Sequence, residues 1–172
     1  DIKKIPKHLL SEPDPIFSFN KAIIDATVEY SVAYKPNIAF YERLGIQGWN
    51  ALNKTIKYLN RTYPEVFTIA DAKRGDISST AEAYARSILS NKGPMQCDSI
   101  TLSPWMGLDT IDPFMPYCQE ESKGLWVLLR TTNPKSDFLQ LHGAETTSAE
   151  HLARALHEMG KNTVGASGFS SV

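Results

Sequence analysis

The sequence TIADAKRGD, residues 68–76, combines an apolar run with a charged end and gives the clearest indication of architecture. Because side chains alternate along a β-strand, Ile69, Asp71 and Lys73 are predicted to share one face. Gly75 permits a tight turn directly afterwards. An acid and a base therefore lie together at the end of a predicted strand, where parallel α/β folds place their chemistry.

Strands and helices alternate on both sides of this segment. Apolar residues at helical or strand spacing predict helices over residues 16–29, 49–59, 79–89 and 147–160, and strands over residues 31–34, 66–72, 99–103 and 125–130. Each connection is long enough for a parallel crossover, and the unbroken apolar run 125–130 is typical of a strand covered on both faces. No linker divides the chain, so we expect an α/β fold in a single domain over residues 1–172.

The composition excludes several classes of function. The 172 residues hold 18 Lys and Arg against 19 Asp and Glu, a net charge of -1, with no basic stripe for a nucleic-acid backbone. The longest apolar run in the predicted strands, residues 125–129, is far too short to span a bilayer. Cys97 and Cys118 form no disulfide framework and have no metal-ligand spacing with the histidines. We therefore expect buried thiols in a reducing cytoplasm.

A second predicted strand also ends in a lysine, Lys35, one βα unit before Lys73. With Asp76 after the turn, two lysines and two carboxylates are able to converge on one edge of the sheet. An exposed ion pair contributes only ~0 to 1 kcal/mol, so a merely solvated strand end is an alternative interpretation. The tripeptide Arg74-Gly75-Asp76 also matches a cell-adhesion motif, but nothing else in the sequence suggests secretion.

The block Asp71-x-Lys73-x-x-Asp76, followed by Thr80 and preceded by Lys35, resembles the orotidine 5'-phosphate decarboxylase family in its longer bacterial form. Further stretches support the resemblance: KPNIAFYE (35–42), TAEAYA (80–85), SPWMG (103–107) and RTTNP (130–134). The resemblance implies a TIM-type (β/α)8 barrel that is incompletely represented, with about four βα units visible and the first and last strands missing.

By the same resemblance, Lys73 is the general acid that delivers a proton to C6 of the pyrimidine as carbon dioxide leaves. Asp71 lies beside the substrate carboxylate, and Lys35 flanks Lys73 in an alternating array of charges that also contacts the ribose. Asp76 reaches the site from the other subunit of a homodimer. A fixed ammonium beside C6 suits this reaction, because negative charge appears there only as the bond breaks.

Three residues are expected to bind the substrate. Thr80 contacts the ribose from the partner subunit, and Thr132 occupies a position where the family usually carries a serine that bonds the pyrimidine edge. Asn37, two residues after Lys35, is the third. The implied activity converts orotidine 5'-phosphate to uridine 5'-phosphate in pyrimidine biosynthesis, with no cofactor, no metal, and no nucleic-acid or membrane partner.

Two alternatives stay open at this point. Asp71 and Asp76 are able to ligate Mg²⁺, as in related sugar-phosphate decarboxylases or synthases, although the adjacent Lys73 repels a divalent ion. A truncated barrel that binds nucleotide without catalysis is the non-enzymatic alternative.

Overall fold

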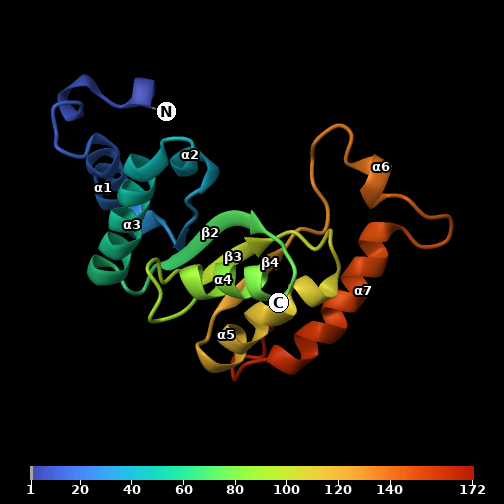
Figure 1. Ribbon diagram of the computed structural model, residues 1–172. Helices are drawn as coiled ribbons and strands as arrows, with labels where there is room; N and C mark the ends of the chain where they lie inside the picture. Colours follow the sequence, from blue (N-terminus) through green and yellow to red (C-terminus); the bar gives the residue numbers. More distant parts are fainter. Residues whose placement is uncertain (1) are drawn as a thin grey trace. The chain divides into compact units, whose positions relative to one another are not determined.

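The protein is an α/β chain whose strands form one four-stranded sheet, in the order β1-β2-β3-β4. Figure 1 labels three of these strands, β2, β3 and β4. The computed structural model describes residues 2–172. Its helices and strands are α1 (Pro15–Thr27), β1 (Ala33–Tyr34), α2 (Ala39–Glu42), α3 (Gly45–Thr62), β2 (Phe67–Arg74), α4 (Ser78–Ile88), β3 (Ser99–Leu102), α5 (Met115–Glu120), β4 (Gly124–Val127), α6 (Asp137–Gln140) and α7 (Ser148–Gly160). The predicted α/β class and the four predicted strands are confirmed.

The chain packs as two compact units. The first comprises residues 1–72 and 86–100, and the second comprises residues 73–85 and 101–172. Strands β2 and β3 therefore each contribute residues to both units. A single domain over residues 1–172 stays a prediction.

In the first unit, α1 and α2 both pack against α3 (Figure 1). Helix α1 begins where its sequence indicates, because Pro15 occupies the first turn and the Asp14 carboxylate accepts a hydrogen bond from the Phe17 N–H over 3.2 Å. The apolar face of α3 is buried, with Leu52 and Ile56 at most 1% exposed. Burial of one such side chain stabilises the fold by roughly 1.5–3 kcal/mol.

A polar contact ties the three helices of this unit together. The Asn20 side-chain amide donates to the Tyr41 hydroxyl and to Thr55 Oγ1, both over 2.9 Å. These residues come from α1, α2 and α3 respectively. Burial raises the pKa of the Tyr41 hydroxyl. The contact keeps α2, which directly follows the Lys35-Pro36-Asn37 segment, in place against α3.

Strand β1 is shorter than predicted and pairs in parallel with β2. Ala33 lies opposite Phe67, and Tyr34 opposite Thr68. The strand ends at Tyr34, the end of the predicted range, and Pro36, which cannot donate to the ladder, follows closely. At the start of β2, the Asp98 carboxylate accepts hydrogen bonds from the Thr68 N–H and hydroxyl over 2.8 and 2.7 Å.

In the second unit, α7 begins with a capping box. The Thr147 hydroxyl accepts from the Glu150 N–H over 3.2 Å, and the Glu150 carboxylate accepts from the Thr147 N–H over 2.8 Å. The hydrogen bonds that the Glu150 carboxylate accepts from the Thr147 N–H and hydroxyl lower the pKa of Glu150. The helix ends at Gly160, as predicted.

The prediction that both faces of β4 are covered was wrong. Leu125 is 6% exposed, whereas Trp126 is 53% exposed. Successive side chains of a strand point to opposite faces, so one face of β4 is packed and the other is open. An apolar run alone does not distinguish this arrangement from a fully buried strand.

The two cysteines are buried free thiols, as predicted. Burial raises the pKa of the Cys118 thiol to about 11. Between residues 2 and 172, no helix is both long and apolar enough to cross a membrane.

Candidate active site

The first unit carries Lys35, Asn37 and Asp71 of the predicted site. The Asn37 side-chain amide donates to Asp71 Oδ2 over 3.2 Å. The backbone makes the same connection: the Asp71 N–H donates to the Pro36 carbonyl over 3.0 Å, and the Ile38 N–H donates to the Asp71 carbonyl over 3.1 Å. Asp71 is only 8% exposed, while Lys35 is exposed. The segment after β1 therefore positions a nearly buried carboxylate.

The second unit begins with Lys73, whose backbone departs from a regular strand. Its φ is 49°, in the left-handed region that costs an L-residue roughly 1–2 kcal/mol. Its N–H donates to Thr101 Oγ1 over 2.9 Å, so a side chain of β3 accepts this hydrogen bond. The regular alternation that predicted a common face for Ile69, Asp71 and Lys73 is therefore interrupted at Lys73, because a left-handed residue is not extended.

The residues after Lys73 are fitted closely against the end of β3. The Ser103 N–H donates to the Arg74 carbonyl over 2.7 Å. A Cβ added to Gly75 would lie 2.4 Å from the Ser103 carbonyl oxygen, so only glycine allows this approach. The Arg74 guanidinium lies 5.2 Å from the centre of the Tyr84 ring. The turn predicted at Gly75 thus has a steric reason.

Asp76 and Thr80 lie at the start of α4. Asp76 is partly exposed, and its Oδ1 accepts from the Ile77 N–H over 2.8 Å. Ser78 has φ 41°, a second left-handed position within six residues of Lys73. Thr80 is exposed on the first turn of α4. Both predicted partner-facing residues therefore stand on one short, tightly turned segment.

Thr132 lies on a loop that is held from one side by Gln140 of α6. The Thr131 N–H donates to Gln140 Oε1 over 2.8 Å, and Gln140 Nε2 donates to Thr131 Oγ1 over 2.9 Å. The Ser136 hydroxyl donates to the Thr131 carbonyl over 3.1 Å. Thr132 itself is exposed. The Thr131 hydroxyl also donates to Asn133 Oδ1 over 2.6 Å, so Thr131 is fixed by four hydrogen bonds while the Thr132 side chain stays accessible.

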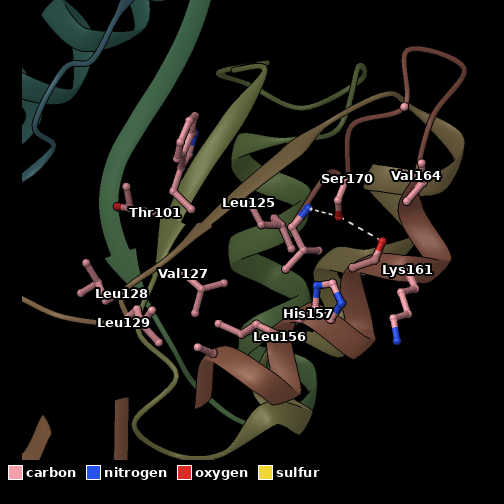
Figure 2. A pocket seen from close by; sticks show the side chains of 15 residues that line it. Thr101, Leu125, Val127, Leu128, Leu129, Leu156, His157, Lys161, Val164 and Ser170 are labelled. Atoms are coloured by element: carbon pink, nitrogen blue, oxygen red, sulfur yellow. Dashed lines mark hydrogen bonds between the residues drawn. The ribbon is translucent and has the colours of Figure 1, made fainter. Parts of the chain in front are cut away.

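Two cavities of the second unit lie near the ends of its strands. A cavity of about 280 Å³ is bordered by Trp105, Thr131 and Gln140. A cavity of about 530 Å³ lies beside β4 and α7, lined by apolar side chains such as Val127 and Leu156 (Figure 2). Neither of these two cavities is lined by a predicted catalytic residue.

Sequence reasoning missed the residues that support the site. Thr101 lies 28 residues after Lys73, and a threonine within a strand is ordinary β-sheet composition. Gln140 lies on a four-residue helix that no periodicity reveals. Only their hydrogen bonds, which depend on the folded chain, distinguish them.

Comparison with known proteins decides the family. The model of the orotidine 5'-phosphate decarboxylase / HUMPS family matches residues 17–171, which is most of the chain. The chain belongs to this family. The resemblance predicted from the Asp71-x-Lys73-x-x-Asp76 block is therefore confirmed.

Curated members of the family are close in sequence. The orotidine 5'-phosphate decarboxylase of Phocaeicola vulgatus is 51% identical over 154 residues, which cover 88% of this chain and 53% of that protein. The one of Christiangramia forsetii is 53% identical over 138 residues, covering 80% of this chain and 48% of that protein. The chain spans about half the length of the curated relatives it matches.

Solved structures of the family share its fold. The OMP decarboxylase of Leishmania donovani superimposes with a TM-score of 0.71 and 38% identity, over 80% of this chain and 52% of that one. The orotidine 5'-monophosphate decarboxylase of Plasmodium berghei gives 0.75 and 27% identity, over 92% of this chain and 54% of that one. The predicted TIM-type barrel class is confirmed, with β1 to β4 adjacent in chain order as barrel strands are.

Proposed function

We propose that the protein carrying this chain decarboxylates orotidine 5'-phosphate to uridine 5'-phosphate in pyrimidine biosynthesis. The observation that carries the proposal is the complete Asp71-x-Lys73-x-x-Asp76 block in a chain about half identical to proteins of that name. The nearly buried Asp71 carboxylate and the left-handed Lys73 support it further, since strained backbone positions cluster at active sites.

In the proposed reaction, the bond between C6 and the carboxylate breaks and its electron pair stays on C6. Carbon dioxide leaves, and the Lys73 ammonium transfers a proton to C6; Lys73 then regains a proton from solvent. The Asp71 carboxylate faces the departing carboxylate, and Lys35 balances its charge. At ~4 Å, each charge pair interacts by roughly 4 kcal/mol at an effective dielectric constant of 20, so a fixed array supplies a substantial part of the barrier reduction.

Asn37 keeps Asp71 in place, Thr132 bonds the pyrimidine edge, and Thr80 contacts the ribose. Asp76 and Thr80 act in the site of a partner subunit, so the functional form is a homodimer. The exposed position of Thr80 on α4 supports this role. The reaction uses neither cofactor nor metal, and the enzyme works in the cytoplasm.

The direct test is an absorbance assay with orotidine 5'-phosphate, using purified protein expressed from its whole coding sequence. We expect loss of substrate absorbance with formation of uridine 5'-phosphate, unchanged by EDTA. No turnover of orotidine 5'-phosphate, together with EDTA-sensitive turnover of a sugar phosphate, would favour the Mg²⁺-dependent alternative instead. Tight nucleotide binding without turnover would favour the non-catalytic alternative.

The shared site is tested by mixing two inactive variants, Lys73→Ala and Asp76→Asn. In a two-fold dimer whose sites combine Lys73 of one subunit with Asp76 of the other, half of the subunits pair in mixed dimers that contain one intact site. Unfolding and refolding the mixture should therefore restore about a quarter of wild-type activity. Recovery of no activity would show that both residues act within one chain.

A further inference from the structure

We propose that Thr101 is a positioning residue for Lys73, holding its backbone in the conformation from which the ammonium acts. This inference rests on the proposed function, because it assigns a task to a residue that does not itself touch the reacting atoms. The observation behind it is the 2.9 Å hydrogen bond from the Lys73 N–H to Thr101 Oγ1. Both residues belong to the second unit.

Lys73 needs an unusual support because its backbone is left-handed, with φ 49°. Non-glycine residues persist in this region only when their surroundings over-determine the conformation. An N–H near a sheet also requires an acceptor when water is excluded. The Thr101 hydroxyl is the acceptor for the N–H of Lys73, the residue whose side chain is proposed to protonate C6.

Thr101 is well suited to act as a fixed acceptor. It is 7% exposed and lies in β3, where every residue is buried. A β-branched side chain has few allowed rotamers, so the hydroxyl holds one direction although Thr101 also lines the cavity of about 530 Å³ beside β4 (Figure 2). The position of Oγ1 is therefore set by the β3 backbone.

The residues after Lys73 are held by the same strand end. The Ser103 N–H donates to the Arg74 carbonyl over 2.7 Å, and Gly75 approaches the Ser103 carbonyl more closely than any residue with a Cβ allows. The segment is thus attached at two points, to Thr101 at the N–H of Lys73 itself and to Ser103 at the carbonyl of Arg74. Because a misplacement of about 1 Å costs roughly 100-fold in rate, releasing one attachment has a measurable effect.

The test compares Thr101→Val, which removes the acceptor at nearly constant shape, with Thr101→Ser, which keeps it. We expect Thr101→Val to lower kcat at least tenfold with KM for orotidine 5'-phosphate changed less than threefold. Thr101→Ser should recover most of kcat. The matched control is Thr110→Val, because Thr110 is 1% exposed and its hydroxyl donates to the Gly107 carbonyl over 2.6 Å. This control should lower the melting temperature but leave kcat of the folded enzyme unchanged.

Hydrogen exchange of the Lys73 amide separates this inference from the proposed function. We expect slow exchange in the wild type and in Thr101→Ser, and exchange at least tenfold faster in Thr101→Val. Unchanged Lys73 exchange, or a folded Thr101→Val enzyme with kcat within twofold of wild type, would overturn the positioning role. A wild type that does not decarboxylate orotidine 5'-phosphate would refute the proposed function, and the inference with it. In that case, faster exchange of the Lys73 amide in Thr101→Val would show only that the contact supports the structure.

Discussion

The side-chain amide of Asn37 donates a hydrogen bond to Oδ2 of Asp71 over 3.2 Å, and the two residues also form a parallel β-bridge. The same asparagine closes its own turn, because its Oδ1 accepts from the Ala39 N–H over 3.1 Å. Asn37, in the segment that follows β1, therefore joins the start of α2 to the nearly buried Asp71 carboxylate on β2. The contact gives Asn37 a role that the motif alone does not specify.

Replacing Asn37 should weaken catalysis in a graded way. Asn37→Ala removes one hydrogen bond to a charged group, worth about 1.5–3 kcal/mol, so kcat/KM should fall about tenfold or more. Asn37→Asp places a second carboxylate beside Asp71, and like charges at this distance disfavour ionisation of both. Its kcat/KM at pH 7 should therefore be lower than that of Asn37→Ala, in steady-state assays with orotidine 5'-phosphate.

Asn37→Ser separates the two contacts of this side chain. A serine is able to accept from the Ala39 N–H but is too short to reach Asp71. We expect its activity to match that of Asn37→Ala. Full activity in Asn37→Ser would mean that the turn, rather than Asp71, requires the asparagine.

Gln140 should control substrate affinity through the Thr132 loop. Gln140→Leu removes both hydrogen bonds to Thr131, so the loop should lose order and KM should rise about tenfold, with a smaller change in kcat. The matched control is Gln119→Leu, at an exposed position on α5. A Gln140→Leu enzyme with wild-type KM would show that the loop does not bind the substrate.

A cluster on the first unit predicts how stability depends on alkaline pH. The hydroxyls of Tyr58 and Tyr63 both donate to Asp25. The interaction of Tyr63 with the Tyr58 hydroxyl, and after it desolvation and the hydrogen bond to Asp25, raise the pKa of Tyr63 from 10.0 to about 12. A phenol whose folded pKa is raised stabilises the fold fully below the unfolded pKa, and this contribution is lost as pH rises from about 10 to 12. The difference in free energy of unfolding between wild type and Tyr63→Phe should therefore shrink over this range.

Urea denaturation at several pH values measures this difference. Tyr30→Phe is the matched control, because Tyr30 is 86% exposed, and its effect should be small at every pH.

The carboxylate partner, Asp25, changes stability at the acidic end of the pH range, in the opposite direction with pH. Its hydrogen bonds with Lys21 and Tyr58 lower the pKa of Asp25 below 3.8, so its contribution is present above that value and is lost as pH falls through the folded pKa. If the Tyr63→Phe difference in free energy of unfolding stayed constant from about pH 9 to 12, the raised pKa of Tyr63 would not be the cause of the alkaline loss of stability.

Local signals predicted much of the fold. The α7 boundaries were predictable because Thr147, Glu150 and Gly160 act within a few residues of the helix ends. The end of β1 was predictable because Pro36 lacks an N–H. The candidate site followed from residue types at fixed spacing in the 68–76 segment, together with the family resemblance.

The remaining features depend on contacts between segments far apart in the sequence. The left-handed backbone of Lys73 is supported by Thr101, and alternation within β2 gives no sign of it. Whether Trp126 of β4 is exposed depends on which segments pack against that face of the strand. The sequence shows only that the run is apolar. The hydrogen bonds of Gln140 with Thr131 likewise form only once α6 folds back on the loop.

The most direct test of the central claim is the rate of orotidine 5'-phosphate decarboxylation by Lys73→Ala, compared with wild type under saturating substrate. General acids typically contribute 10²–10⁴-fold, so the rate should fall by roughly that factor or more while uridine 5'-phosphate still binds. A folded Lys73→Ala protein that decarboxylates at the wild-type rate would contradict the claim that this lysine supplies the proton.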